Sequence, residues 1–226
     1  MSLTVLDRLA RKLIVSSQAM DPRSPLRHPE ILALLAQAAE LGGAGGFRVN
    51  GADVVSALRP ATKLPIIGIV KDNREGFDNY ITTTSADIEA LCASGADMVA
   101  IQATTGTRPG PDFAELAAAA HARGVLVMAD IATLDEAIAA VSTGADVVAT
   151  TMVGYTTATA GAERPPFDLV RILSDGLDCP VIVEGGVWTP EHVAMSFAAG
   201  AYAVVSGSAV TAPDLITRRL VDAIEG

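Results

Sequence analysis

The stretch "AAVSTGADVVATTM", residues 139–152, decides the fold, because its pattern recurs along the chain. An alanine-rich helical segment ends in a turn at Gly144, and a run of β-branched residues follows directly. Glycine after a helix supplies a left-handed C-cap, and the short loop then leads into the next strand. The turns at Gly95, Gly144 and Gly200 are spaced to hold two strand–helix units in each interval. Related stretches are "AAELGGAGGFRVN" (38–50), "ALCASGADMVAIQA" (90–103) and "FAAGAYAVVSGSA" (197–209).

The remaining apolar runs and amphipathic segments predict eight strands alternating with eight helices. The strands are expected at 13–18, 45–50, 65–71, 97–103, 125–131, 146–151, 179–184 and 202–207. The helices are expected near 30–41, 52–58, 85–94, 112–123, 133–143, 166–176, 189–199 and 212–225. Runs that are apolar throughout are typical of a parallel sheet covered on both faces. This order predicts an α/β protein, a (β/α)₈ TIM barrel.

A doubly wound open sheet is the alternative architecture. It usually carries a glycine-rich fingerprint after its first strand, whereas this chain reads "SSQAMDPRSPLRHP" over residues 16–29. The segment "MSLTVLDRLARKL", residues 1–13, predicts a short amphipathic N-terminal helix. No linker or low-complexity tract divides the sequence, so residues 1–226 are expected to form a single TIM-barrel domain.

Composition narrows the classes of partner. A net charge of −10 argues against nucleic acid or an anionic membrane as partner, but leaves room for a small anionic ligand. No apolar run reaches the roughly 18 residues of a membrane span, and no signal peptide is evident. Cys92 and Cys179 lie too far apart in sequence for a metal or redox motif, which favours free thiols in a reducing compartment, the cytoplasm. The histidines show no metal-binding spacing, so no metal is expected. A homodimer is ordinary for a barrel of this size.

Polar or flexible residues stand at the end of every predicted strand. In a TIM barrel these ends meet at one mouth, where the active site lies. The sequence therefore predicts a ring of chemical groups at that mouth. The strand-end residues are Gln18, Arg48, Lys71, Gln102, Asp130, Thr150 with Thr151, Glu184 with Gly185 and Gly186, and Ser206 with Gly207 and Ser208.

Lys71 and Glu184 are the candidates for catalysis. Lys71 continues the inward parity of Ile67 and Ile69 in "PIIGIVK", residues 65–71. The third and seventh strands lie opposite each other in a ring of eight, so an amine and a carboxylate should face each other, which suits proton transfer at a carbon between them. Burial and a nearby cation such as Arg48 would lower the pKa of the lysine, and Glu184 would raise it. A salt bridge that closes the mouth is the alternative.

The last two strand-to-helix loops are candidates for a phosphate site. They read "GGVWTPEH" (185–192) and "SGSAVTAPD" (206–214). TIM barrels often bind phosphate with these loops and a following helix N-terminus. The expected contacts are Gly185, Gly186, Gly207 and Ser208. The alternative is that both loops are simply tight turns with helix caps.

Several of these segments resemble the N-acylglucosamine-6-phosphate 2-epimerases. They are "LIVSSQA" (13–19), "FRVN" (47–50), "LPIIGIVK" (64–71), "VMADIAT" (127–133), "GYT" (154–156) and "PVIVEGG" (180–186). The resemblance runs from about residue 11 to the C-terminal "LITRRLVDAI". It implies a TIM barrel and a cofactor-independent isomerase that interconverts N-acetylmannosamine 6-phosphate and N-acetylglucosamine 6-phosphate in sialic acid catabolism.

The resemblance also implies roles for individual residues. Lys71 would act on the C2 proton of the open-chain sugar and Glu184 would be its acidic partner. Removal of that proton beside the C1 aldehyde gives an enolate, and protonation of the other face inverts C2. Asp130 could instead cap a helix or order a loop. The residues expected to hold the sugar are Gln18, Arg48, Asp130, Gln102, Arg108 and Tyr155.

The chain departs from the family at three positions. The family usually carries Asp at Gln102, Arg at Gly106 and, after the last strand, Arg at Ala212. Loss of an arginine–anion pair weakens phosphate recognition. Two alternatives therefore stay open: a relative that epimerises another amino sugar, which need not be phosphorylated, and a non-catalytic barrel that binds a sugar phosphate. A metal-dependent pentose-phosphate epimerase is disfavoured, because its His and Asp ligands are missing.

Overall fold

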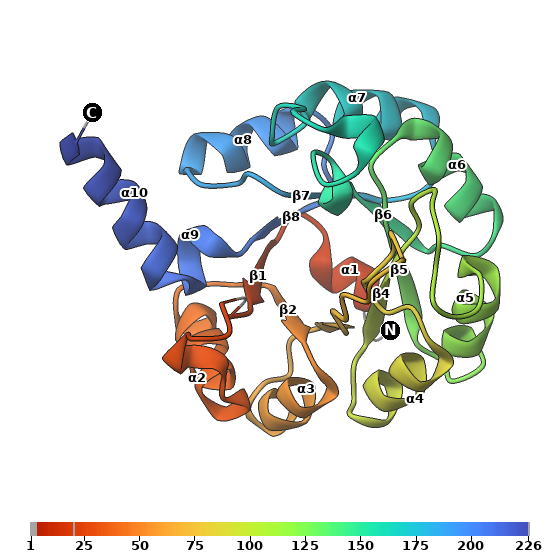
Figure 1. Ribbon diagram of the computed structural model, residues 1–226, viewed down its shortest axis with the longest axis horizontal. Coiled ribbons are helices and arrows are strands. Elements are labelled where there is room, and N and C mark those ends of the chain that lie inside the picture. The colour runs from red at the N-terminus through yellow and green to blue at the C-terminus, as the bar shows by residue number, and fades with distance from the viewer. Residues whose placement is uncertain (1–3, 20, 226) are drawn as a thin grey trace.

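The computed structural model describes residues 4–19 and 21–225. Its strands form a closed parallel barrel in which each strand pairs with the next and β8 pairs with β1 (Figure 1). The strands are β1 (Leu13–Ser17), β2 (Gly46–Asn50), β3 (Ile66–Ile69), β4 (Met98–Gln102), β5 (Leu126–Asp130), β6 (Val147–Ala149), β7 (Val181–Glu184) and β8 (Ala203–Ser206). Helices alternate with the strands and surround the barrel (Figure 1). The predicted (β/α)₈ architecture is confirmed, and the open sheet is excluded.

Ten α-helices and four short 3₁₀ helices lie within the described residues. The α-helices are α1 (Val5–Leu9), α2 (Pro29–Leu41), α3 (Ala52–Leu58), α4 (Ser85–Ala93), α5 (Phe113–His121), α6 (Leu134–Ser142), α7 (Phe167–Gly176), α8 (Pro190–Ala198), α9 (Ser208–Thr211) and α10 (Pro213–Glu225). The 3₁₀ helices are η1 (Pro25–Arg27), η2 (Arg59–Ala61), η3 (Thr150–Met152) and η4 (Thr157–Thr159). The predicted N-terminal helix is α1, which begins with a capping box between Thr4 and Asp7.

Several predicted ends shift by one or two residues, and β3 stops at Ile69, so that Lys71 follows the strand. Two further differences change the elements themselves. The expected helix 212–225 is divided at Ala212 into α9 and α10, since Pro213 starts a new helix. The expected strand 146–151 stops at Ala149, and the chain turns into η3. The Thr150 hydroxyl explains this second difference, because it donates to the Glu184 carbonyl oxygen and accepts from the Glu184 N–H.

Apolar side chains fill the barrel interior and the layer between barrel and helices. Inside the barrel, Ile67 and Ile69 of β3 pack with Ile182 of β7 and Val205 of β8. Leu9 of α1 belongs to the same cluster. Because successive strand residues alternate between the two faces, the residues that follow Ile69 and Ile182 by two positions are directed toward the barrel axis. Those residues are Lys71 and Glu184.

Glycine ends the helices that precede three of the strands. Gly95, Gly144 and Gly200 have φ values of 95°, 114° and 99°, in the left-handed region that favours glycine. The repeated turn in the sequence therefore takes the predicted conformation. No helix among the described residues has the length and apolar character needed to cross a membrane.

Candidate active site

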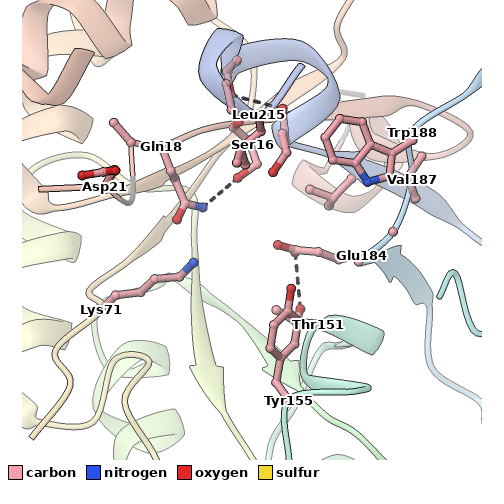
Figure 2. A pocket seen from close by; sticks show the side chains of 18 of the residues that line it. Ser16, Gln18, Asp21, Lys71, Thr151, Tyr155, Glu184, Val187, Trp188 and Leu215 are labelled. Carbon is pink, nitrogen blue, oxygen red and sulfur yellow. Dashed lines mark hydrogen bonds between the residues drawn. The ribbon is translucent and has the colours of Figure 1, made fainter. Parts of the chain in front are cut away.

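A cavity of about 760 Å³ opens at the carboxyl ends of the strands. Its wall comes from the loops after β1, β3, β6, β7 and β8, which lie far apart in the sequence. Figure 2 shows side chains from these loops converging on one space. The predicted site residues that line it are Gln18, Lys71, Tyr155, Glu184, Gly185, Gly186, Gly207 and Ser208.

Lys71 and Glu184 enter the cavity from opposite sides (Figure 2). The backbone of Lys71 is held by the Asn50 side-chain oxygen, which accepts from its N–H at 2.9 Å, and by a bridge to Ile81. On the other side, the Thr151 hydroxyl oxygen lies 3.3 Å from Glu184 Oε2. Both groups are therefore anchored at the ends of rigid barrel strands, as a catalytic pair requires.

A buried charge network lies beneath the cavity floor. Arg48, whose side chain is wholly inaccessible, donates to both oxygens of Asp130 at 2.9 and 2.6 Å. Arg48 Nη1 also lies 2.8 Å from Glu184 Oε2. The Thr151 hydroxyl donates to Asp130 at 2.6 Å. Two carboxylates thus compensate the buried guanidinium, which would otherwise be costly to desolvate.

This network changes the expected placement of Arg48 and Asp130. Both are fully buried and neither lines the cavity. Asp130 is bound to Arg48 through both oxygens, and the next helix, α6, is capped by Thr133. The alternative of Asp130 as a helix cap is therefore wrong. In this structure Arg48 contacts the Glu184 carboxyl group from the buried side of the cavity wall, and Asp130 contacts Arg48.

Burial favours the uncharged form of both candidate catalytic groups. Burial lowers the pKa of Lys71, and the nearby guanidinium of Arg48 lowers it further, against the opposing effect of Glu184. Burial raises the pKa of Glu184, more than Arg48 lowers it. Both shifts favour the uncharged forms, a neutral amine and a protonated carboxyl group. These are the states that a base and an acid need to move a proton between them.

Gln102 and Arg108 lie outside the cavity wall. The buried Gln102 side-chain oxygen accepts from the N–H groups of Tyr80 and Ile81 at 2.9 and 3.3 Å. Arg108 Nη2 donates to the Gln102 carbonyl oxygen. Their contacts hold the loop between β3 and α4, which carries Tyr80 to the cavity wall. The alternation of residues along β4 does not reveal that this loop covers the carboxyl end of the strand.

Gly106, another departure from the family, occupies a position closed to a larger side chain. Its φ is 136°, and an added Cβ would lie 2.8 Å from Asp78 Cβ. The Asp78 carboxylate accepts from both the N–H and the hydroxyl of Thr107, at 2.8 Å each. The loop after β3 and the loop after β4 are therefore joined at this point.

The two glycine-containing loops after β7 and β8 lie beside each other in the cavity wall. Gly185 and Gly186 have φ values of 106° and 77°, and an added Cβ at Gly186 would lie 2.6 Å from Arg164 Cβ. Ala212 also lines the cavity, so position 212 contributes a methyl group there. Among the described residues, the N–H groups of Gly185, Gly186 and Gly207 donate to no partner. They are available to an anion.

Several residues of the cavity wall carry no signal in the sequence that marks them as site residues. Arg164 stands in the loop after β6, where no periodicity or motif marks it. Ser16 belongs to β1 and accepts from Gln18 Nε2 at 2.7 Å (Figure 2). Gln18 Oε1 is buried and has no hydrogen-bond partner among the described residues. An unpaired buried acceptor of this kind calls for a donor from a ligand.

Comparisons with known proteins identify the family of this chain. Residues 32–226 match the family model described as "Putative N-acetylmannosamine-6-phosphate epimerase". A relative from Clostridioides difficile, named "Putative N-acetylmannosamine-6-phosphate 2-epimerase", is 44% identical over 98% of this chain and 99% of its own. A relative of the same name from Caldanaerobacter subterraneus is 39% identical over 100% of this chain and 96% of its own.

Solved structures show the same relationship. The structure of the N-acetylmannosamine-6-phosphate 2-epimerase from Clostridium perfringens superposes with a TM-score of 0.94 at 38% identity, over 99% of this chain and 97% of that one. The thiamine phosphate pyrophosphorylase from Pyrococcus furiosus, 16% identical with a TM-score of 0.65, shows the fold alone.

Fold and site together define a TIM-barrel protein with an amine and a carboxyl group opposed across its mouth. The extent of the sequence match then gives the particular family. The chain belongs to the N-acetylmannosamine-6-phosphate epimerase family. The resemblance drawn from the sequence segments is confirmed.

Proposed function

We propose that this protein is an isomerase that interconverts N-acetylmannosamine 6-phosphate and N-acetylglucosamine 6-phosphate by moving a proton at C2. The opposition of Lys71 and Glu184 across the cavity carries the proposal. The substrate is taken from the relatives, which are named as N-acetylmannosamine-6-phosphate 2-epimerases. A protein that only binds sugar has no need for a base and an acid on opposite sides of one cavity.

The proposed reaction needs only the substrate and these two side chains. In the open-chain sugar the C1 aldehyde acidifies the C2 proton. Neutral Lys71 takes that proton, and the electron pair of the C2–H bond forms the C1–C2 double bond of an enolate. Protonated Glu184 then gives a proton to the opposite face of C2, and the aldehyde forms again. The reverse reaction exchanges the two roles, and no cofactor is involved.

The remaining groups have supporting roles in this proposal. Arg48 Nη1 fixes the Glu184 carboxyl group at 2.8 Å, and Asp130 holds Arg48 in place through an ion pair of 2.6 Å. Gln18 Oε1, buried without a partner among the described residues, is placed to accept a hydrogen bond from the N-acyl N–H or a hydroxyl group of the sugar. Tyr155 contributes to the wall on the opposite side (Figure 2). The phosphate lies against the amides of Gly186 and its neighbours.

We also propose that the protein is a cytoplasmic homodimer. The structure shows α10 extending away from the barrel (Figure 1). On this helix Leu220 and Ile224 are 66% and 83% exposed, an apolar face that a second copy would cover. The free thiols of Cys92 and Cys179 suit a reducing compartment. Light scattering on the purified protein tests the dimer, and a monomer mass at micromolar concentration would contradict it.

Turnover of purified protein tests the proposed reaction. Incubation with N-acetylmannosamine 6-phosphate is expected to give N-acetylglucosamine 6-phosphate, resolved by NMR from the starting sugar. Ala212 makes the unphosphorylated sugar the informative competitor, since position 212 offers no cation. Preference for unphosphorylated N-acetylmannosamine would favour the alternative substrate. Binding of either sugar without turnover would favour the non-catalytic barrel.

A further inference from the structure

The proposed phosphate loops need a cation that position 212 does not supply. Ala212 presents a methyl group to the cavity. A phosphate dianion in a partly buried site is held most strongly by arginine, which forms paired charge-assisted hydrogen bonds. Apart from Lys71 at the reacting end, the cations in the cavity wall are Arg164 and Arg218. These two arginines are therefore the candidates for a charged partner of the phosphate.

Arg164 lies in a space cleared by glycines from two loops. An added Cβ at Gly154 would lie 3.3 Å from Arg164 Cδ and Nε, and one at Gly185 would lie 3.8 Å from Arg164 Cδ. At Gly186 an added Cβ would overlap with Arg164, 2.6 Å from its Cβ. All three glycines have positive φ, at 83°, 106° and 77°. The side chain thus runs along the same loop that carries the free amides.

The guanidinium of Arg164 is positioned to use its charge on a ligand. It stacks over the Tyr155 ring, with Cζ 4.5 Å from the ring centroid. Stacking occupies the face of the guanidinium and leaves its N–H groups free in the plane. Among the described residues, no carboxylate forms an ion pair with Arg164. Its charge is therefore not neutralised within the described chain.

Arg218 is the weaker candidate. It belongs to α10, and its charge acts on Asp21, another residue of the cavity wall. The pKa of Asp21 is lowered mainly by hydrogen bonds from Arg23, with a further contribution from Arg218. A phosphate beside Arg218 would face the Asp21 carboxylate, whereas no carboxylate of the described residues forms an ion pair with Arg164.

We infer that Arg164 is the phosphate-binding residue that determines preference for the phosphorylated sugar, in place of an arginine at position 212. The inference rests on the proposed function for the identity of the sugar. It assigns the phosphate to the space between Arg164 and the amides of Gly185 and Gly186. It also explains why Tyr155 and three glycines converge on this side chain.

Calorimetric binding tests the inference without requiring turnover. The probes are N-acetylglucosamine 6-phosphate and unphosphorylated N-acetylglucosamine, each titrated into wild-type protein and Arg164→Ala. We expect Arg164→Ala to lose affinity for the phosphorylated sugar by roughly 10- to 100-fold, the range of a charge-assisted hydrogen bond or pair of bonds. Affinity for the unphosphorylated sugar should stay the same. The preference for the phosphorylated sugar should fall accordingly.

Two further variants make the result specific. Arg171→Ala removes the same charge from the exposed surface of α7, outside the cavity, and should leave the preference unchanged. Ala212→Arg, added to Arg164→Ala, should restore part of the lost preference, because it returns a cation to the cavity wall. Arg164→Gln provides a second test of the same position if Arg164→Ala is unstable by thermal unfolding.

Two results would overturn the inference. One is an unchanged preference in Arg164→Ala and Arg164→Gln; the other is a wild-type protein that binds the unphosphorylated sugar as tightly as the phosphorylated one. Failure of the proposed reaction is a separate result, seen as tight binding of both epimers by wild-type protein without interconversion. In that case the effect of Arg164 on the preference still decides the inference.

Discussion

Arg48 Nη1 lies 2.8 Å from Glu184 Oε2, although the Arg48 side chain is wholly buried and the Glu184 side chain keeps 14% of its surface exposed. Glu184 therefore stands between a closed charge network and the open cavity. The network fixes the carboxyl group on one side and leaves its other side facing a ligand. The amine of Lys71 faces this carboxyl group from the opposite side of the cavity.

Replacing Lys71 by methionine should abolish turnover and leave the fold intact. A positioned general base contributes about 10²- to 10⁴-fold to rate, so kcat should fall by at least that order. The free energy of unfolding should not decrease, because a desolvated amine is replaced by an apolar side chain. Steady-state kinetics and urea unfolding measure both effects. Lys63→Met, at a less buried position outside the cavity, is the control, and equal loss of activity in both variants would refute the assignment.

Removing the buried guanidinium should destabilise the protein strongly. Arg48→Met leaves Asp130 and Glu184 buried without their cation, a change that costs about 3–5 kcal/mol. The midpoint of urea unfolding should fall accordingly. The surface pair of Arg123 and Glu89 provides the matched control, since Arg123→Met should change stability by less than about 1 kcal/mol. Similar losses of stability in Arg48→Met and Arg123→Met would show that the loss does not depend on burial of the charge network.

Turnover should depend on pH along both limbs of a bell-shaped profile. At low pH both groups are protonated and Lys71 cannot act as a base; at high pH both are deprotonated and Glu184 cannot donate. Burial lowers the pKa of Lys71 and raises that of Glu184. The midpoints of the two limbs should therefore lie closer to pH 7 than the pKa values of free lysine and glutamate side chains. The measurement is kcat/KM against pH. A flat profile across the ordinary pKa values of both groups would contradict the proposal.

The same shifts predict how stability depends on pH. With its pKa lowered on folding, Lys71 binds more protons in the unfolded state, so its destabilising effect fades as pH rises toward its ordinary value of 10.5. The stability advantage of Lys71→Met over wild type should therefore narrow between neutral pH and that value. Urea unfolding of both proteins at several pH values checks this. A gap that stays constant or widens would mean that the pKa of Lys71 is not lowered.

Gly186 should tolerate no side chain. In Gly186→Ala the added methyl group meets Arg164 Cβ at 2.6 Å and the backbone must keep a φ of 77°. We expect a loss of roughly 1 kcal/mol or more from strain alone and a weaker affinity for the 6-phosphate. Gly176→Ala is the control, because Gly176 ends α7 with open space around it. Thermal unfolding measures the change in stability of each variant, and calorimetry measures the change in its affinity for the 6-phosphate. Both changes should be opposite in sign in the two variants, or clearly larger in Gly186→Ala.

Much of this site could be predicted because strands have a period of two. Ile67, Ile69 and Lys71 share one parity, and the order of strands then sets Glu184 opposite. Gln102 shares the strand-end position of Gln18, yet the loop carrying Tyr80 covers it. Which loop covers a strand end depends on packing between loops, and the periodicity of a single strand contains no such information.

Arg164 is a second residue whose position cannot be predicted from strand periodicity. Its loop contains no alternation, and its position depends on Gly154 in the same loop and on Gly185 and Gly186 after β7. The division of α9 from α10 at Ala212, by contrast, has a local signal, because Pro213 favours the start of a new helix. The prediction of a single helix over residues 212–225 does not take this signal into account. Local signals in the sequence predicted the barrel and the opposed pair. Contacts between loops decide which other side chains reach the cavity.

Proton NMR in D₂O tests the central claim most directly. Wild-type protein, Lys71→Met and Glu184→Gln are each incubated with N-acetylmannosamine 6-phosphate and, separately, with N-acetylglucosamine 6-phosphate. The account predicts that wild-type product carries deuterium at C2, and that neither variant interconverts the sugars. Each variant should exchange the C2 proton of at most one of the two epimers, because only one of the two opposed groups remains. Interconversion by Lys71→Met at the wild-type rate, or wild-type product without deuterium at C2, would contradict proton transfer by Lys71 and Glu184.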